Sequence, residues 1–182
     1  MLILILALAA MPAQAQKNEL SIGAGGYVPI NLTGVGAALA IEGSYARRIA
    51  SVPVLSAYIE LPVVGTLKST VTSVGLASSA SYSALFVAPG LKLKLAPSFP
   101  VSPWFAAGAG VAHFGANALL GGGSTNTGLF DYGGGVDFKL APFVSLRAEL
   151  RDFYSGAIAF SLAGFAQRQH NVVGTAGLVV RF

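Results

Sequence analysis

The sequence contains no cysteine, and only 10% of its 182 residues are charged. An ordinary soluble domain has about 25% charged residues, so the chain is too apolar for that class. Without cysteine it can form neither a disulfide framework nor a thiolate metal site. Also missing is an unbroken apolar run of about 18 residues, the length that a membrane helix needs. The nearest candidate, 104–123, is interrupted by His113 and Asn117 and diluted by glycine, which disfavours a helix.

The residues that are abundant point to a membrane sheet. Hydrophobic residues make up 54% of the chain, 23 residues are glycine, and the mean hydropathy is +0.68. This apolar content is spread along the whole chain, which excludes intrinsic disorder. The net charge is +4, but the basic residues are scattered singly, so we expect no nucleic-acid partner. An apolar chain without membrane helices predicts a sheet whose outer face meets lipid.

The first 15 residues read as a secretory signal peptide. An apolar run, 1–11, is followed by Pro12 and by Ala13-Gln14-Ala15, a small-x-small site for signal peptidase. The run has no lysine or arginine before it, and a misassigned start codon would explain that. We therefore predict cleavage before Gln16 and a single domain over 16–182.

A period of two residues runs through the rest of the chain. In 143–151 the side chains of Ser145, Arg147, Glu149 and Arg151 share one face, and the residues between them are apolar. This alternation is typical of a strand with one polar and one apolar face. The same test predicts eight strands, over 19–28, 35–48, 53–61, 82–95, 103–114, 128–140, 143–153 and 170–182. Pro89 falls inside the fourth, which predicts a bulge or a later start there.

The connections between these strands alternate in length. Short ones are predicted at 49–52, 96–102 and 141–142, and longer ones at 29–34, 62–81, 115–127 and 154–169. Short turns at one end and long loops at the other, with an even strand count, are typical of an eight-stranded antiparallel up-and-down transmembrane β-barrel. Such a sheet must close, because an open edge would leave backbone groups unpaired in lipid. Both termini would lie at the short-turn end, on the periplasmic side of a bacterial outer membrane.

The charged residues of the strands are predicted to point into the barrel. An eight-stranded lumen is narrow enough for side chains to fill, and buried charges persist when they are paired. The alternation therefore favours an electrostatic plug over an ion path. The predicted network contains Glu42, Glu60, Lys92, Lys94, Asp137, Lys139, Arg147, Glu149, Arg151 and Arg181, and the same register adds Glu19, Asp131 and Arg48.

Aromatic residues near the strand ends are candidates for the girdles that anchor barrels at membrane interfaces. Packing in the barrel interior is the alternative for each of them. They are Tyr27, Tyr45, Trp104, Phe114, Phe138, Phe153 and Phe182.

The C-terminal segment resembles the targeting signal of outer-membrane barrels. Thr175, Gly177, Val180 and the terminal Phe182 occupy its polar, glycine, hydrophobic and aromatic positions, although an aromatic is commoner at the position of Val180. The segments 103–111, 131–138 and 144–153 resemble strands five to seven of the OmpA-like, or opacity-type, barrel family. This resemblance covers the mature chain and implies recognition by the barrel-assembly machinery, but it says little about activity. It also implies contact with outer-membrane lipid and lipopolysaccharide.

The sequence disfavours an enzyme. Some eight-stranded barrels modify lipid A with a histidine, a serine and a carboxylate. His113 and His170 sit at the loop ends of strands, yet neither has a serine two residues later. Asp131 or Asp152 could reach one of them. With two separated histidines and no cysteine, we expect neither a metal nor another cofactor.

The last predicted loop contains the apolar segment 155–166. Strand extension and packing on other loops is favoured over contact with a surface partner. Taken together, the sequence predicts a structural or surface-interaction protein that is not an enzyme. A narrow channel for small or hydrophobic solutes and a lipid A-modifying enzyme are the alternatives.

Overall fold

The chain folds into a closed antiparallel β-barrel of eight strands. The computed structural model describes residues 16–30, 36–67, 69–71, 80–116, 123–156 and 168–182. In these ranges its strand segments are β1 (Asn18–Ile30), β2 (Ala38–Val52), β3 (Leu55–Thr66), β4 (Ser69–Val71), β5 (Ala80–Val87), β6 (Gly90–Leu95), β7 (Val101–Ala116), β8 (Gly123–Ala141), β9 (Val144–Ser155) and β10 (Gln169–Arg181). β5 and β6 together form one barrel strand, and β4 is a short extension paired with β5.

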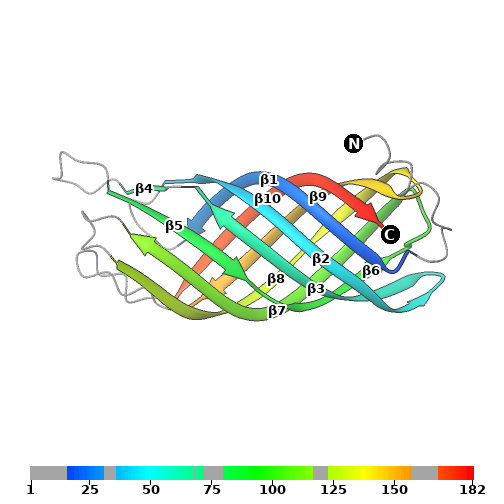
Figure 1. Cartoon of the computed structure of the whole chain (residues 1–182), viewed down its shortest axis with the longest axis horizontal. Helices are drawn as coiled ribbons and strands as arrows, with labels where there is room; N and C mark the ends of the chain where they lie inside the picture. Colours follow the sequence, from blue (N-terminus) through cyan, green and yellow to red (C-terminus); the bar gives the residue numbers. More distant parts are fainter. Residues whose placement is uncertain (1–15, 31–35, 68, 72–79, 117–122, 157–167) are drawn as a thin grey trace.

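The barrel closes between its first and last strands. β1 pairs with β10 from Glu19 opposite Arg181 to Ile30 opposite His170, and β1 also pairs with β2. Every other barrel strand likewise pairs with a strand on each side. The strands run obliquely to the long axis of the molecule (Figure 1). Closure thus leaves none of the eight barrel strands with an unpaired side, as a lipid-facing sheet requires.

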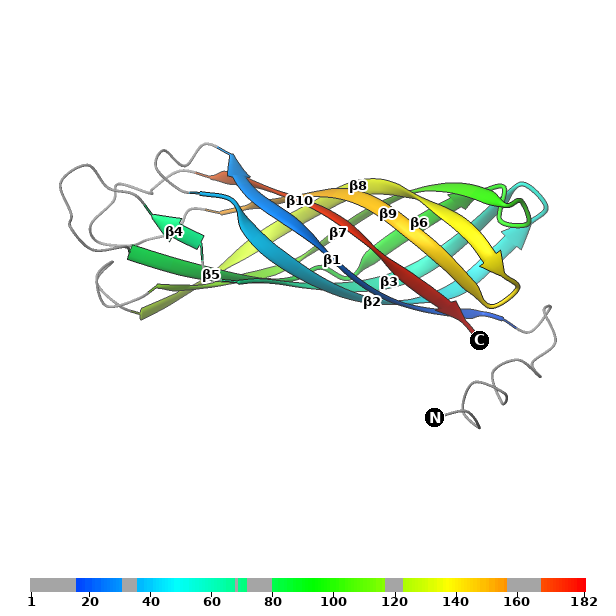
Figure 2. The ribbon, with the colours of Figure 1, turned by 90° about the horizontal axis from the view of Figure 1, so that it is seen from above.

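One end of the barrel holds the tight turns and the end of the chain. The turns after β2, β6 and β8 lie there, close to the start of β1 and the end of β10 (Figures 1 and 2). We call this the turn end and the opposite one the loop end. Phe182 accepts a backbone hydrogen bond from Asn18 (2.9 Å) and donates one to it (3.0 Å). The last residue is thereby fixed in the sheet.

The strands match the predicted ones but are mostly longer. The prediction for Pro89 is confirmed, because Ala88 and Pro89 separate β5 from β6. The sequence predicts that the third strand stops at residue 61, before Pro62, and that boundary is wrong. Pro62 lies inside β3 with its side chain buried, and its carbonyl accepts a hydrogen bond from the Ala88 amide (3.3 Å). β3 continues to Thr66 because the interrupted neighbour lets a proline be accommodated there.

The predicted loops are correspondingly shorter. β7 extends to Ala116 and β8 begins at Gly123. Both ends of the loop expected over 115–127 therefore belong to the sheet. Of the apolar segment predicted in the last loop, only Ser155 and Gly156 are described, and the prediction for the remainder lies outside the described residues.

The outer face of the barrel is an apolar belt. Large hydrophobic side chains alternate outward along every barrel strand, among them Leu20, Ile22, Ile41, Ile59, Leu61, Leu91, Leu93, Phe105, Val111, Phe138, Leu146, Leu150 and Leu178. Within the described ranges no helix is both long and apolar enough to cross a membrane.

Candidate functional site in the barrel lumen

The inward faces of the strands carry nearly all the buried charge. On β9 the order from the turn end is Arg147, Glu149, Arg151 and Phe153, all buried, while the residues between them face outward. The period-two pattern therefore sorts polar side chains inward and apolar ones outward, the reverse of a soluble barrel. The lumen is the place where this chain concentrates its chemistry.

Glu19 on β1 connects the charges nearest the turn end. Its carboxylate forms ion pairs with Lys92 (3.1 Å), Lys94 and Arg147 (3.4 Å), and Arg181 joins it at 3.1 Å. Asp137 on β8 is a second acceptor in the same layer, bound by Arg147 (2.8 Å) and Lys94 (2.7 Å). Each buried base therefore has more than one carboxylate as partner, which offsets the cost of removing it from water.

Arg151 connects the next layer, towards the loop end. It contacts Glu60 (2.6 Å), Asp131 (2.8 Å) and Glu149 (3.1 Å) with its three nitrogens. Lys92 ties the layers together, because it pairs with Glu60 at 2.8 Å as well as with Glu19. Glu42, at the edge of the network, accepts a hydrogen bond from Thr175 (2.9 Å).

The structure brings together nine of the ten predicted network residues, and Glu19 and Asp131 with them. Lys139 is the exception. Lys139 pairs in register with Ser145 near the end of β8. It lies at the turn-end mouth, where it is exposed and donates a hydrogen bond to the Ser98 carbonyl (3.2 Å). Arg48 also stands at this mouth, partly exposed.

The side chain at the centre of the network is Trp104, for which the sequence leaves a girdle and an interior position open. The interior alternative is observed, because Trp104 is fully buried. Its ring lies 4.8 Å from the Arg147 guanidinium carbon and 5.2 Å from that of Arg151. The Lys92 ammonium is 5.5 Å from the same ring. Stacked cations are favourable partners for an indole face.

The interior alternative also holds for Tyr27, Phe114 and Phe153, which are fully buried inside the barrel. Tyr45 and Phe138 do face outward, and Phe182 is partly exposed at the turn end. The three inward rings surround Phe86, whose ring centroid lies 4.9 Å from Phe153 and 5.8 Å from Phe114. This aromatic cluster fills the lumen on the loop side of the charges.

The lumen therefore has two filled layers. Along β3, Glu60 of the charged network comes before Val64, which packs in the aromatic cluster. A water column through the barrel would have to pass both layers, whose side chains are almost inaccessible to solvent. Among the described residues, no cluster of three or more histidine, aspartate or glutamate side chains could hold a metal ion.

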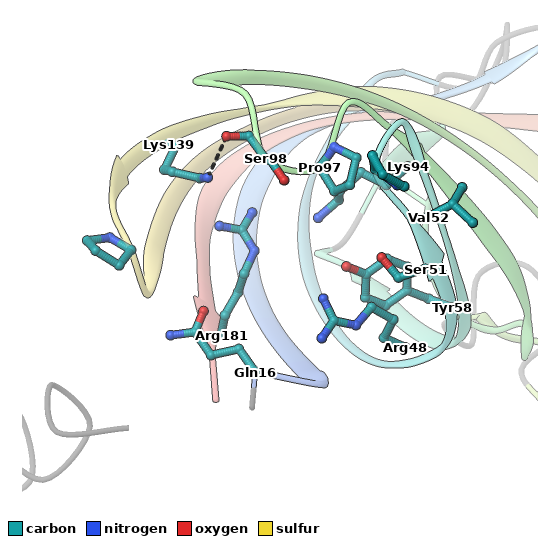
Figure 3. Close-up of a pocket in the computed structure, with 12 residues that line it drawn as sticks. Gln16, Arg48, Ser51, Val52, Tyr58, Lys94, Pro97, Ser98, Lys139 and Arg181 are labelled. Atoms are coloured by element: carbon teal, nitrogen blue, oxygen red, sulfur yellow. Dashed lines mark hydrogen bonds between the residues drawn. The ribbon is translucent and has the colours of Figure 1, made fainter. Parts of the chain in front are cut away.

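The turn-end mouth opens into a cavity of about 490 Å³. Figure 3 shows Lys139 and Arg181 on one side of it and Arg48, Tyr58 and Lys94 on the other. Among the described residues, no aspartate or glutamate lines this cavity. Its walls also include the side chains of Gln16, Ser51, Val52, Pro53, Pro97, Ser98 and Pro142.

A polar cluster also occurs on the outer face, near the loop end. His170 Nδ1 lies 2.5 Å from Asp152 Oδ2, and the Tyr132 hydroxyl donates to the same oxygen (2.6 Å). The Tyr154 ring packs 4.7 Å from the imidazole. His113 contacts Asn126 instead (2.6 Å). The predicted proximity of Asp152 to a histidine is thus observed, but in the described residues no serine or threonine hydroxyl bonds to either imidazole.

The C-terminal signal residues have roles in the barrel itself. Thr175 points inward to Glu42, and Gly177 packs so closely on β1 that a Cβ atom would lie 2.0 Å from the Ile22 carbonyl oxygen. Val180 is partly exposed on the face opposite the lumen. Their recognition by an assembly machinery stays a prediction.

Comparison with solved structures places this geometry among known barrels. Neisserial surface protein A is similar with a TM-score of 0.62 and 16% identity, over 91% of this chain and 97% of that one. OprG from Pseudomonas aeruginosa is similar with a TM-score of 0.56 and 12% identity, over 92% of this chain and 97% of that one. A third similar structure, with a TM-score of 0.54 and 14% identity, is Ail, the attachment invasion locus protein of Yersinia pestis, in complex with the heparin analogue sucrose octasulfate. The similarity covers 91% of this chain and 99% of that one.

Comparison by sequence identifies no family for the chain. No model of a protein family matches the chain, and no curated protein is significantly similar to it in sequence. The structural likeness covers nearly the whole of each barrel, while the identities lie far below those at which function can be transferred. The chain shares its closed eight-stranded antiparallel fold with barrels of the bacterial outer membrane.

Proposed function

We propose that this chain is an integral barrel of a bacterial outer membrane, closed to solutes, that acts by presenting its loop end to partners. The observation that carries the proposal is the inverted distribution of side chains. Paired charges such as Arg147 and Asp137 fill the interior, while leucine, isoleucine and phenylalanine cover the outside. An apolar exterior of this extent has a favourable environment only in lipid.

The filled lumen supports a role other than transport. Trp104, Phe86 and Arg151 are each fully buried in the middle of the barrel, where a channel would need an open path. Eight-stranded barrels leave an interior that side chains can fill. Burying the Arg151 guanidinium costs desolvation energy that only close pairing offsets, so opening a path would leave charges unpaired.

The loop end supports contact with external partners. β7 and β8 continue past the apolar belt, and their outward side chains become polar and exposed there, as in His113, Ser124 and Asn126. Such a surface favours water over lipid and would stand above the membrane. The names of two similar structures, a neisserial surface protein and an attachment invasion locus protein, agree with a role at the cell surface.

The localisation is tested by the electrophoretic mobility of the refolded protein. A closed barrel resists SDS without heating, so the unboiled protein should migrate faster than the boiled one. Identical mobility would contradict the membrane barrel. If the protein is a barrel of the outer membrane, lipopolysaccharide is the lipid partner expected at the outer leaflet.

The closed lumen is tested by conductance in planar bilayers. The native protein should give no steady ion current, because the charged and aromatic layers block the path. A steady current that falls when Arg147 is replaced by glutamine would establish the channel alternative. The matched control is Arg47→Gln on the outer face of β2, which removes the same charge outside the lumen.

A second candidate function rests on the contact between His170 and Asp152. A carboxylate that orients an imidazole is one part of an acyl-transfer site, and this pair faces outward, where it could meet outer-leaflet lipid. The mass spectrum of lipid A from cells making the native chain or His170→Ala tests it. A change in lipid A that depends on His170 would establish an enzyme, whereas identical spectra support the non-catalytic role.

A further inference from the structure

We propose that the cavity at the turn end of the barrel is a binding site for a soluble oxyanion with at least two negative charges, such as a pyrophosphate. The cavity measures about 490 Å³, within the range of roughly 300 to 1,000 Å³ that holds small-molecule ligands. It opens along the axis of the barrel and is separate from the outer lipid-facing surface.

The charged residues that the structure describes on the walls of this cavity have one sign. Arg48, Lys94, Lys139 and Arg181 line it, and no described aspartate or glutamate does. They come from β2, β6, β8 and β10, so the positive charges surround the space instead of forming a patch on one side (Figure 3). Cations converging from several walls of a concave site attract and orient an anion.

Two of these four cations already have carboxylate partners. Lys94 pairs with Asp137 at 2.7 Å, and Arg181 pairs with Glu19 at 3.1 Å and with Asp137 at 3.3 Å. These bonds hold both side chains in place at the floor of the cavity. Their positive charge is therefore largely balanced by the network.

The other two cations are not balanced. Among the described residues no carboxylate forms an ion pair with Arg48 or Lys139, and the only hydrogen bond of the Lys139 ammonium goes to the neutral Ser98 carbonyl. The alternation in the sequence predicts both residues in the lumen network. Because they lie outside it, two unpaired positive charges face the cavity. A ligand that neutralises them carries at least two negative charges.

The remaining walls suit an oxyanion as well. Hydroxyl groups of Ser51, Tyr58 and Ser98 line the cavity, and Ser51 is already held by a 2.7 Å hydrogen bond to Ser56. Three prolines, Pro53, Pro97 and Pro142, form the adjoining turns. Because proline restricts the backbone, these walls lose little freedom when a ligand binds.

Calorimetry with pyrophosphate tests the site on the refolded barrel in a detergent that has no phosphate group. The native protein should bind one equivalent. The variants Arg48→Gln and Lys139→Gln should each bind about tenfold more weakly, a factor that corresponds to about 1.4 kcal/mol. Arg47→Gln is the matched control, because it removes the same charge from the neighbouring residue, whose side chain faces outward and lies outside the cavity.

Three results would overturn the proposal. The first is that the native protein does not bind pyrophosphate. The second is that Arg47→Gln weakens pyrophosphate binding as much as Arg48→Gln and Lys139→Gln do, because that result would indicate unspecific attraction to a basic protein. The third comes from nanodiscs: if phosphatidylglycerol displaces pyrophosphate from the native protein and phosphatidylcholine does not, the ligand is a lipid headgroup instead of a soluble anion. Should a variant not fold, NMR of the native barrel decides, since bound pyrophosphate must shift the backbone amides of Ser51 and Ser98.

Discussion

The Arg147 guanidinium lies against the face of Trp104, with 4.8 Å between its central carbon and the centroid of the ring. Its Nε donates a hydrogen bond to Asp137 Oδ1 at 2.8 Å, and its Nη2 donates one to Asp137 Oδ2 at 3.1 Å. The tryptophan thus covers one face of a cation whose Nε and Nη2 atoms bind a carboxylate. This arrangement lets a charge stay buried where neither water nor a single counter-ion would be sufficient.

Replacing Arg147 with methionine should therefore destabilise the barrel strongly. The substitution keeps most of the side-chain volume but leaves Asp137 and Glu19 with fewer partners in a dry lumen. Removing one partner of a buried ion pair costs about 3–5 kcal/mol, and unfolding by urea in detergent micelles measures it. Arg47→Met, on the outer face of the barrel, should change the free energy of unfolding far less. A similar loss in both variants would contradict the network.

Trp104 reports on the same region, because it is the only tryptophan of the chain. In the folded barrel it is fully buried, so its fluorescence should be quenched weakly by acrylamide, and the urea-unfolded chain should be quenched strongly. If the folded protein is quenched as much as the unfolded one, the lumen is wet and the two filled layers do not exist in solution.

The positions of the charges could be predicted from sequence because the side-chain period of a strand is two. The same parity could have located the buried rings. Phe153 has the parity of Arg151 on β9, and Tyr27 that of Glu19 on β1, so both belong to the inward face. Their nearness to strand ends, by contrast, left both the girdle and the interior open.

The pairing of the charges could not be predicted in this way. Glu19 and Arg181 are 162 residues apart and meet only because β1 closes on β10. Which acid reaches which base depends on the relative shift of neighbouring strands around the barrel. Lys139 shows the limit of parity, since it has the inward parity of Asp137 but lies at the exposed turn-end mouth of the barrel, outside the ion-pair network.

Close contact between β1 and β10 makes Gly25 sensitive to substitution. A Cβ atom there would lie 1.9 Å from the Gly174 carbonyl oxygen, whereas at Gly26 nothing lies within 4 Å. Gly25→Ala should therefore force the two closing strands apart and lower the free energy of unfolding by about 1–3 kcal/mol, or prevent folding. Gly26→Ala is the adjacent control and should fold normally. Equal stability of the two variants would mean that the strands are not packed as described.

Lysine scanning of the outer face tests whether lipid surrounds the belt. Leu150 and Val54 are similarly exposed, at 60% and 69%, but Leu150 lies within the belt on β9 and Val54 in the turn between β2 and β3. Near the middle of a bilayer a lysine costs about 2–4 kcal/mol, and near the interface the cost falls to about 0–1 kcal/mol. In phospholipid vesicles, Leu150→Lys should therefore lower the free energy of unfolding by several-fold more than Val54→Lys. In water the two exposed sites would tolerate lysine equally, so equal effects in vesicles would show that the belt does not contact lipid.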